Sequence, residues 1–162
     1  MERPTREQYF IELAEAASKR STCDRARVGC VLVTGDHHVI ATGYNGSLPG
    51  ENHCDEVGHL MEDGHCVRTI HAEINALASC AKKGIATKDC TLYTTHSPCT
   101  RCYLALKRAG ITKFVAKQMY GPIRYDVKLA FSQPTQEMLP KFPPLPPCRH
   151  CGTTDLCECQ DQ

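Results

Sequence analysis

Two short stretches of the chain carry residues that can bind a metal ion and move protons. The first is His71-Ala72-Glu73, and the second is Ser97-Pro98-Cys99-Thr100-Arg101-Cys102. One imidazole and two thiolates suit a tetrahedral Zn²⁺ ion whose fourth position stays open for water, as in catalytic zinc sites. Glu73 stands two residues after the histidine and is free to move protons. The pattern predicts a water-activating zinc site with His71, Cys99 and Cys102 as ligands.

The order H-x-E…P-C-x-x-C is typical of zinc-dependent deaminases. Zinc can lower the pKa of bound water from 15.7 to about 7, which yields hydroxide at neutral pH. We expect Glu73 to take the proton of that water, deliver it to the ring nitrogen beside the attacked carbon, and then protonate the departing ammonia. The alternative is a closed structural zinc site, for which His96 is the nearest fourth ligand.

Composition indicates an ordinary globular domain. The chain has 162 residues, of which 41% are hydrophobic and 23% charged. We predict a catalytic domain over residues 1–140, a Pro-rich linker over 141–147 and a Cys-rich tail over 148–162. A net charge of +1 gives no basic stripe for a polynucleotide substrate. No apolar run approaches the roughly 20 residues of a membrane span, and the start lacks a signal-peptide pattern, so a cytoplasmic location is expected.

Strand and helix patterns alternate along the first 130 residues. This rhythm predicts an α/β sandwich with a partly parallel sheet. The helix from Thr69 would carry His71 in its first turn, and the helix opened by Pro98 would place both cysteines on one face. The expected helices cover residues 5–20, 69–83, 98–110 and 125–131, and the expected strands cover 28–33, 38–44, 91–95 and 113–117.

Twelve cysteines are unusual for a chain without an export signal, and favour metal ligands over disulfides. We interpret Cys30, Cys80 and Cys90 as buried apolar residues. A second group could form a closed structural zinc site with a histidine from the long polar loop over residues 45–68. Free thiols are the alternative. This group consists of Cys23, Cys54 and Cys66, with His53, His59 and His65 as candidate fourth ligands.

The tail holds four more cysteines within twelve residues, compact enough for a separate tetrahedral zinc site. The alternatives are a disordered tail and one whose thiols bind a partner. The four are Cys148, Cys151, Cys157 and Cys159.

Over about residues 5 to 125 the chain resembles the deoxycytidylate (dCMP) deaminases of bacterial and phage type, within the zinc-dependent cytidine and deoxycytidylate deaminase family. The resemblance implies a cytidine-deaminase-like three-layer α-β-α sandwich around a mixed sheet of about five strands. It implies hydrolysis of dCMP to dUMP and ammonia, which supplies thymidylate synthesis. The motifs that carry it are Val28-Gly29, Thr42-Gly43-Tyr44-Asn45-Gly46, the run from Gly64 to Glu73, and Ser97-Pro98-Cys99.

The resemblance also implies residue roles. Asn45 would bind the sugar 3′-hydroxyl, and the main chain near Ala72 and Ser97 would contact the base. Arg25 would bind the 5′-phosphate, with Arg27 and Tyr120 as alternatives. Among the loop histidines the resemblance favours His65 as the fourth ligand of the second zinc site.

Regulation and assembly are expectations from the same resemblance. It implies a hexamer activated by dCTP, bound with Mg²⁺ near Gly43, Asn45 and Gly46, and inhibited by dTTP. Other candidate substrates are dCTP, cytidine or a modified dCMP. A catalytically silent, zinc-held binding module is the candidate from a different class.

Overall fold

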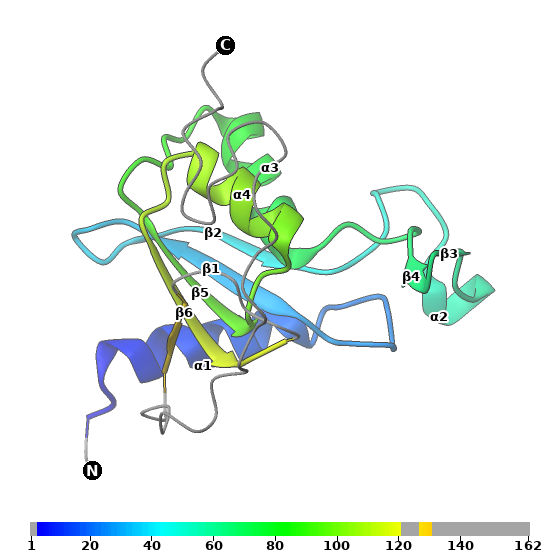
Figure 1. The fold of residues 1–162 in the computed structure, drawn as a ribbon, viewed down its shortest axis with the longest axis horizontal. Helices are drawn as coiled ribbons and strands as arrows, with labels where there is room; N and C mark the ends of the chain where they lie inside the picture. The colour runs from blue at the N-terminus through cyan, green and yellow to red at the C-terminus, as the bar shows by residue number, and fades with distance from the viewer. Residues whose placement is uncertain (1–2, 121–126, 131–162) are drawn as a thin grey trace, which may run out of the picture. The chain divides into compact units, whose positions relative to one another are not determined.

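A five-stranded mixed sheet forms the centre of the protein in the computed structural model, which describes residues 3–120 and 127–130 (Figure 1). The strands lie in the order β2-β1-β5-β6-β7. β1 is antiparallel to both β2 and β5, whereas β5, β6 and β7 are parallel. The prediction of a mixed sheet of about five strands is confirmed. The strands are β1 (Gly29–Val33), β2 (Val39–Tyr44), β5 (Thr91–His96), β6 (Lys113–Gln118) and β7 (Lys128–Leu129).

Helices cover both faces of the sheet because the central strands are apolar on both sides, as alternating side chains of a buried strand must be. Helix α1 (Arg6–Ser18) packs on the face that carries Val31 and Val33. Helices α3 (Ala72–Lys83) and α4 (Thr100–Arg108) pack on the opposite face with Cys30 and Leu32. The predicted three-layer sandwich is therefore confirmed.

Three cysteines act as core residues, as predicted. Cys30, Cys80 and Cys90 are at most 1% exposed and belong to the apolar cluster between the sheet and helices α3 and α4. Burial raises the pKa of each of these thiols, so they remain neutral at physiological pH. Their neutral, buried thiols distinguish them from Cys23, Cys99 and Cys102, whose sulfur atoms lie close to histidine side chains.

The ends of α1 and α3 follow from local hydrogen bonding. Thr5 Oγ1 accepts from the N–H of Gln8 at 3.2 Å, and Gln8 Oε1 accepts from the N–H of Thr5 at 2.8 Å, forming a capping box at the start of α1. Gly84 ends α3 in the left-handed region, with φ of 66°, as its position after Lys83 predicts.

The start of α3 differs from the sequence prediction. Thr69 is not its N-cap, because the next residue, Ile70, forms an extended antiparallel bridge with Gly46, with N···O distances of 2.9 and 3.1 Å. A residue held in this bridge is not helical, so the N-cap moves to His71 and the helix begins at Ala72. The bridge thereby brings the predicted metal ligand to the very end of the helix.

Two further predictions are wrong. Leu104 in α4 is 54% exposed and does not belong to the core, unlike Leu106 two residues on. Within the expected helix over 125–131, the described residues contain strand β7, and the N–H of Ala130 donates to Ala116 O at 2.9 Å. The backbone groups along the edge of β6 take a strand as their partner, which local sequence preference did not indicate.

Several predictions fall outside the described residues. These are the Pro-rich linker over 141–147, the sheet edge expected between Phe131 and Phe142, and the tail cysteines Cys148, Cys151, Cys157 and Cys159. Among the residues that the structure describes, no helix is long and apolar enough to cross a membrane.

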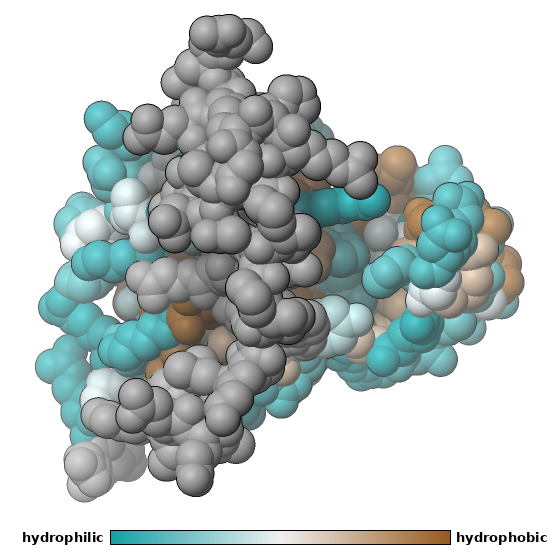
Figure 2. All heavy atoms as spheres, in the orientation of Figure 1, coloured by the Kyte–Doolittle hydropathy of each residue, from teal (hydrophilic) through white to brown (hydrophobic). Residues whose placement is uncertain are grey.

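The segment between β2 and α3 extends away from the sheet as an arm, which we define as residues 47–69 (Figure 1). It contains the short helix α2 (Cys54–Val57) and a hairpin of β3 (Met61–Glu62) and β4 (His65–Cys66). Figure 2 shows hydrophobic residues at its surface. Since so small an element buries little apolar surface, something besides a core must order it. Its exposed apolar residues are Leu48, Val57, Leu60, Met61 and Val67.

We predict that Gly43→Ala destabilises the protein by roughly 2–3 kcal/mol, as overpacking of a dense interface does. A Cβ at Gly43 would lie 2.1 Å from Ala72 O and 2.9 Å from Ala76 N, and both are backbone atoms that cannot move independently of α3. Urea denaturation measures the change in the free energy of unfolding. Gly35→Ala is the control because a Cβ there meets nothing within 4 Å. Equal stability of the two variants would contradict this account of the packing.

Candidate active site and second metal cluster

The predicted catalytic ligands come together at the N-termini of two helices. His71 is the N-cap residue of α3, Cys99 is the N-cap residue of α4, and Cys102 lies in the first turn of α4. The backbone N–H groups of a first helical turn lack partners within the helix and, with the helix dipole, favour negative charge. The fold therefore presents both sulfur atoms where a thiolate is stabilised.

The spacing of the three ligand atoms fits one tetrahedral zinc ion. His71 Nδ1 lies 3.7 Å from Cys99 Sγ and 3.4 Å from Cys102 Sγ. Zinc–ligand bonds of about 2.3 Å to sulfur and about 2.0 Å to nitrogen imply an S···N separation of about 3.6 Å at the tetrahedral angle. His71 is exposed whereas Cys102 is buried, so one side of the cluster faces solvent. These residues can hold zinc with a position left for water.

The two thiols differ in proton affinity. A hydrogen bond from Cys102, with a second contribution from His71, lowers the pKa of Cys99 to about 3. The resulting thiolate raises the pKa of Cys102 by its hydrogen bond, and burial raises it further. A hydrogen bond to Cys99 also raises the pKa of His71. The cluster thus concentrates negative charge and holds protons that a cation would replace.

Glu73 lies in the first turn of α3, and its carboxyl group is hydrogen-bonded with Cys102 of the cluster. It is only 3% exposed, and burial raises the pKa of its carboxyl group. Glu73 is not one of the three clustered ligands. A buried carboxyl group beside a metal site, outside the ligand set and with a raised pKa, has the properties of a general acid–base.

His96, the alternative fourth ligand, faces elsewhere. Its Nδ1 lies 3.0 Å from Thr95 Oγ1, and its Nε2 contacts the side chain of Gln118. Within residues 3–120 and 127–130, no fourth His, Cys, Asp or Glu joins His71, Cys99 and Cys102. The geometry therefore favours an open site over the closed structural site.

Asn45, predicted to bind the sugar, is buried at the end of β2. Its Oδ1 accepts from the N–H of Val28 at 2.8 Å, and its Nδ2 donates to Ala26 O at 2.8 Å. These two bonds hold the segment that leads into β1. One lone pair and one N–H of the amide remain for a ligand, since an asparagine amide can form four hydrogen bonds.

Two main-chain positions predicted to contact the base are buried at the helix N-termini. Ala72 is the first residue of α3. Ser97 precedes α4, its N–H donates to Gln118 O at 2.9 Å, and its hydroxyl accepts from the N–H of Tyr120 at 2.8 Å. Tyr120 itself is 57% exposed. Ser97, the residue before the P-C-x-x-C motif, is thus hydrogen-bonded to the end of β6 and to the residues that follow it.

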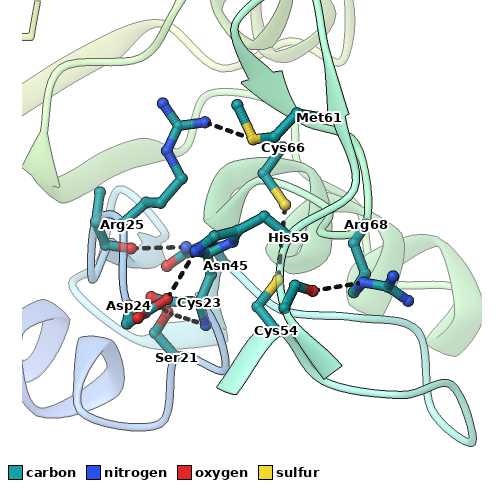
Figure 3. A network of polar contacts seen from close by, with 12 residues as sticks. Ser21, Cys23, Asp24, Arg25, Asn45, Cys54, His59, Met61, Cys66 and Arg68 are labelled. Atoms are coloured by element: carbon teal, nitrogen blue, oxygen red, sulfur yellow. Dashed lines mark hydrogen bonds and ion pairs between the residues drawn. The ribbon is translucent and has the colours of Figure 1, made fainter. Parts of the chain in front are cut away.

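The candidate phosphate ligands occupy different environments. Arg25 reaches the arm, where its guanidinium donates to Gly64 O at 3.2 Å and approaches Met61 Sδ at 3.2 Å (Figure 3). Arg27 is exposed and borders a surface hollow together with Lys19 and His96. Both arginines keep donors available, because a guanidinium has five N–H groups.

A second cluster joins Cys23 to the arm (Figure 3). Cys54 Sγ lies 3.6 Å from Cys66 Sγ, and Cys23 Sγ lies 3.8 Å from His59 Nδ1. The four ligand atoms all lie within 4.8 Å of one another. About 3.6 Å for S···N and about 3.8 Å for S···S are expected around one zinc ion. Four protein ligands fit a closed, structural site.

The fourth ligand differs from the sequence prediction, because the structure brings His59 and not His65 to the three thiols. His65 precedes Cys66 on β4, and neighbouring residues of a strand point to opposite sides. Cys66 faces the cluster, so His65 is exposed. His59 was one of three candidates, and nothing in its sequence neighbourhood distinguished it.

The second cluster also holds a proton that a metal ion would replace. Burial acts to raise the pKa of Cys66, but the backbone N–H of Arg68 and contacts with His59 and Cys54 lower it to about 6. Burial and the hydrogen bond to Cys66 raise the pKa of Cys54 to about 12. Of the two thiols, Cys66 therefore gives up its proton more readily than Cys54.

Sequence reasoning missed two contacts that fix His71. These are the bridge between Gly46 and Ile70 and the hydrogen bond from Asn75 Nδ2 to Tyr44 O at 2.8 Å. The only sequence feature at the bridge is the motif GYNG, whose last residue, Gly46, is buried and pairs with Ile70 through its main chain. No local pattern indicates the second.

An α-β-α sandwich that brings His, Cys and Cys together at two helix N-termini, with a buried glutamate beside them, defines the class of zinc-dependent deaminases. Comparison with known proteins identifies the family within this class. Residues 4–118 match the family described as cytidine and deoxycytidylate deaminase zinc-binding region. The chain belongs to this family.

The similar proteins include short bacterial and phage members. ComE operon protein 2 of Bacillus subtilis (strain 168) is 47% identical over 129 residues, which cover 80% of this chain and 68% of that protein. Deoxycytidylate deaminase of Mycobacterium phage D29 is 35% identical over 127 residues, covering 71% of this chain and 96% of that protein. Matches to two fungal deoxycytidylate deaminases span 39% of those longer proteins.

The fold is similar to a solved enzyme structure. The crystal structure of dCMP deaminase from the cyanophage S-TIM5, in complex with dCMP and dUMP, matches with a TM-score of 0.64 and 30% sequence identity. The match covers 74% of this chain and 86% of that chain.

We predict that His59→Ala lowers the zinc content by one ion per chain, whereas His65→Ala leaves it unchanged. The first variant removes one of four ligands, and the second removes an exposed side chain that lies outside the cluster. Metal analysis of the purified full-length variants by mass spectrometry measures the difference from wild type. Loss of zinc in His65→Ala alone would identify His65 as the fourth ligand. Equal zinc content in wild type and both variants would contradict the second site.

Proposed function

We propose that this protein hydrolyses dCMP to dUMP and ammonia and so supplies dUMP for thymidylate synthesis. His71, Cys99 and Cys102 hold the catalytic zinc ion, and Glu73 moves the protons. The observation that carries the proposal is the open three-ligand cluster beside the buried Glu73. Two phage proteins support the choice of dCMP. The relative from Mycobacterium phage D29 is named deoxycytidylate deaminase, and the similar structure from cyanophage S-TIM5 is a dCMP deaminase in complex with dCMP and dUMP.

The reaction replaces the amino group on C4 of cytosine with an oxygen atom from water. A bound zinc ion supplies Lewis-acid activation of that water, lowering its pKa to about 7. Glu73 accepts the proton that the water loses and passes it to the ring nitrogen beside C4. Glu73 then takes the proton of the new hydroxyl group on C4 and gives it to the amine. As the C4–N bond breaks, C4 becomes a carbonyl carbon and the amine departs as ammonia. Burial suits this role, because a raised pKa lets Glu73 hold a proton between steps.

Substrate binding follows from the surrounding residues. Asn45 offers its remaining lone pair and N–H to the sugar 3′-hydroxyl, and the main chain at Ala72 and Ser97 contacts the base. Arg25 binds the 5′-phosphate, with Arg27 and Tyr120 as the alternatives. Arg25 is favoured because the segment that carries it is held on one side by Asn45 and on the other by the arm.

A second zinc ion, held by Cys23, Cys54, His59 and Cys66, orders the arm. The arm has few buried apolar residues, and a closed metal site supplies folding free energy where a core is too small. The same ion fixes Cys23, two residues before Arg25. It therefore acts on substrate binding through structure and not through chemistry.

Regulation and assembly complete the proposal. dCTP with Mg²⁺ activates and dTTP inhibits through the loop that contains Gly43, Asn45 and Gly46, and the chain assembles as a hexamer. These three properties rest on the resemblance to dCMP deaminases. Gly43 is buried against α3, so an effector would act there by shifting the first turn of that helix.

We predict that Glu73→Gln lowers the rate of ammonia release from dCMP by about 10²- to 10⁴-fold, the usual contribution of a general acid–base. Glutamine keeps the shape of the side chain but cannot carry the proton, so the zinc content stays at the wild-type value. Coupled ammonia assays and metal analysis on the same preparation measure both quantities.

Glu12→Gln is the control for this substitution. It makes the same charge change on the exposed side of α1, on the opposite face of the sheet, and leaves the rate unchanged. A Glu73→Gln protein that holds zinc and deaminates dCMP at the wild-type rate would exclude Glu73 as the proton carrier.

We predict that dCMP is preferred over deoxycytidine by about 10- to 150-fold in kcat/KM, because a hydrogen bond to a charged group contributes about 1.5–3 kcal/mol. Arg25→Ala reduces this preference by slowing the turnover of dCMP and not that of deoxycytidine. Arg27→Ala is the matched variant, because it removes the same type of side chain from the alternative phosphate ligand. Ammonia release from dCMP, dCTP and deoxycytidine, with and without dCTP or dTTP, measures the preference.

Each other outcome points to a specific change in the proposal. Equal losses on dCMP and deoxycytidine in Arg25→Ala would remove its phosphate role. Preferred turnover of dCTP would keep the zinc chemistry and change the substrate. No turnover of any cytosine compound by zinc-loaded protein would favour a binding module.

A further inference from the structure

The residue after Cys23 contacts the histidine of the second cluster. His59 Nε2 lies 3.0 Å from Asp24 Oδ1, while His59 Nδ1 faces Cys23 Sγ at 3.8 Å (Figure 3). Two consecutive residues thus approach the two nitrogens of one imidazole ring. Cys23 approaches the nitrogen that faces the thiols, and Asp24 approaches the one that faces away from them.

This arrangement selects one tautomer of His59. An ionised carboxylate only accepts hydrogen bonds, so a hydrogen bond to Asp24 requires the proton on Nε2. A neutral imidazole protonated on Nε2 carries its lone pair on Nδ1, which is the atom among the sulfurs. The contact also fixes the rotation of the ring about its bond to Cβ, because both nitrogens then have a partner.

We propose that Asp24 is a positioning residue for the metal ion of the second cluster, which it orients through His59 without binding the ion itself. The inference rests on the second zinc site proposed above and adds a residue to it. Carboxylates that accept from the distal nitrogen of a metal-bound histidine typically change metal affinity by 10- to 100-fold. The side chain of Asp24 is 66% exposed, which weakens its hydrogen bond through competition with water, so we expect the low end of this range.

The rest of the segment explains why one residue can have this effect. Ser21 Oγ accepts from the N–H of Cys23 at 3.3 Å, and Arg25 donates to Gly64 O on the arm hairpin. Asp24 therefore lies between two anchored residues, which limits the positions from which its carboxylate can reach His59. His59, in contrast, lies in the loop between α2 and β3, and Asp24 is the partner of its Nε2, the ring nitrogen that faces away from the thiols.

The test measures zinc affinity by competition with a chromophoric chelator on the full-length, zinc-loaded protein. We expect about tenfold weaker binding of the most readily released zinc ion in Asp24→Ala. Asp24→Asn should lose less than Asp24→Ala, since its amide oxygen still accepts from Nε2–H but carries no charge. Asp63→Asn is the matched control, because it removes the same charge from an exposed arm turn whose φ of 46° suits asparagine.

A spectroscopic measurement separates orientation from general stability. Cobalt(II) replaces zinc in such sites and its visible absorption reports ligand geometry. We expect the Asp24→Ala band to shift or broaden and the Asp63→Asn band to match wild type. His59→Cys provides a second test, because a thiolate has no distal nitrogen to orient. In that background Asp24→Ala should cost no zinc affinity.

Two results would overturn the inference. One is an Asp24→Ala protein with wild-type zinc affinity and a wild-type cobalt spectrum. The other is an equal loss of affinity from Asp24→Ala in the wild-type and the His59→Cys backgrounds, which would make Asp24 a general stabiliser of the loop. Failure of the second zinc site itself is a separate result, recognised by equal zinc content in wild type and His59→Ala.

Discussion

The close approach of α3 to β2 determines where the candidate catalytic ligands meet. Gly43 allows it, because any side chain there would overlap the carbonyl group of Ala72. The bridge between Gly46 and Ile70 then fixes the residue before His71. α4 follows β5 directly, and β5 and β2 both border β1, so the N-termini of the two helices converge on the same end of the sheet. In this packing His71 Nδ1 lies 3.7 Å from Cys99 Sγ and 3.4 Å from Cys102 Sγ.

The two candidate metal clusters share ligand types but differ in ligand number. The first has three ligand residues, one of them an exposed histidine, and a buried carboxyl group nearby, an arrangement that suits an open, water-activating site. The second has four ligand residues drawn from Cys23 and the arm, an arrangement that suits a closed, structural site. The number of ligands, more than their type, separates the chemical site from the structural one.

The sequence contains the candidate catalytic ligands in two short motifs, and the structure places each motif at one helix start, where the three side chains lie close together. The sequence predicted the sheet, whose strands are locally apolar. It failed where the deciding contact is distant in sequence. The start of α3 depends on the bridge to Gly46, and β7 depends on the edge of β6. The choice between His59 and His65 depends on which side of β4 faces Cys23, and adjacency to Cys66 favoured the wrong residue.

The segment from Ser21 to Val28 connects the second cluster to Asn45, next to the residue that pairs with Ile70. Cys23 and Asp24 contact the second cluster, Arg25 contacts the arm, and the side chain of Asn45 holds Ala26 and Val28. Ordering an irregular segment costs roughly 1–2 kcal/mol of backbone entropy per residue. The second zinc ion that we propose, at one end of the segment, would offset part of that cost before substrate arrives. Asn45 is attached to the other end of the segment. In the function that we propose, an ordered arm would therefore leave the Asn45 amide in position, and substrate binding would not have to order this region of the protein.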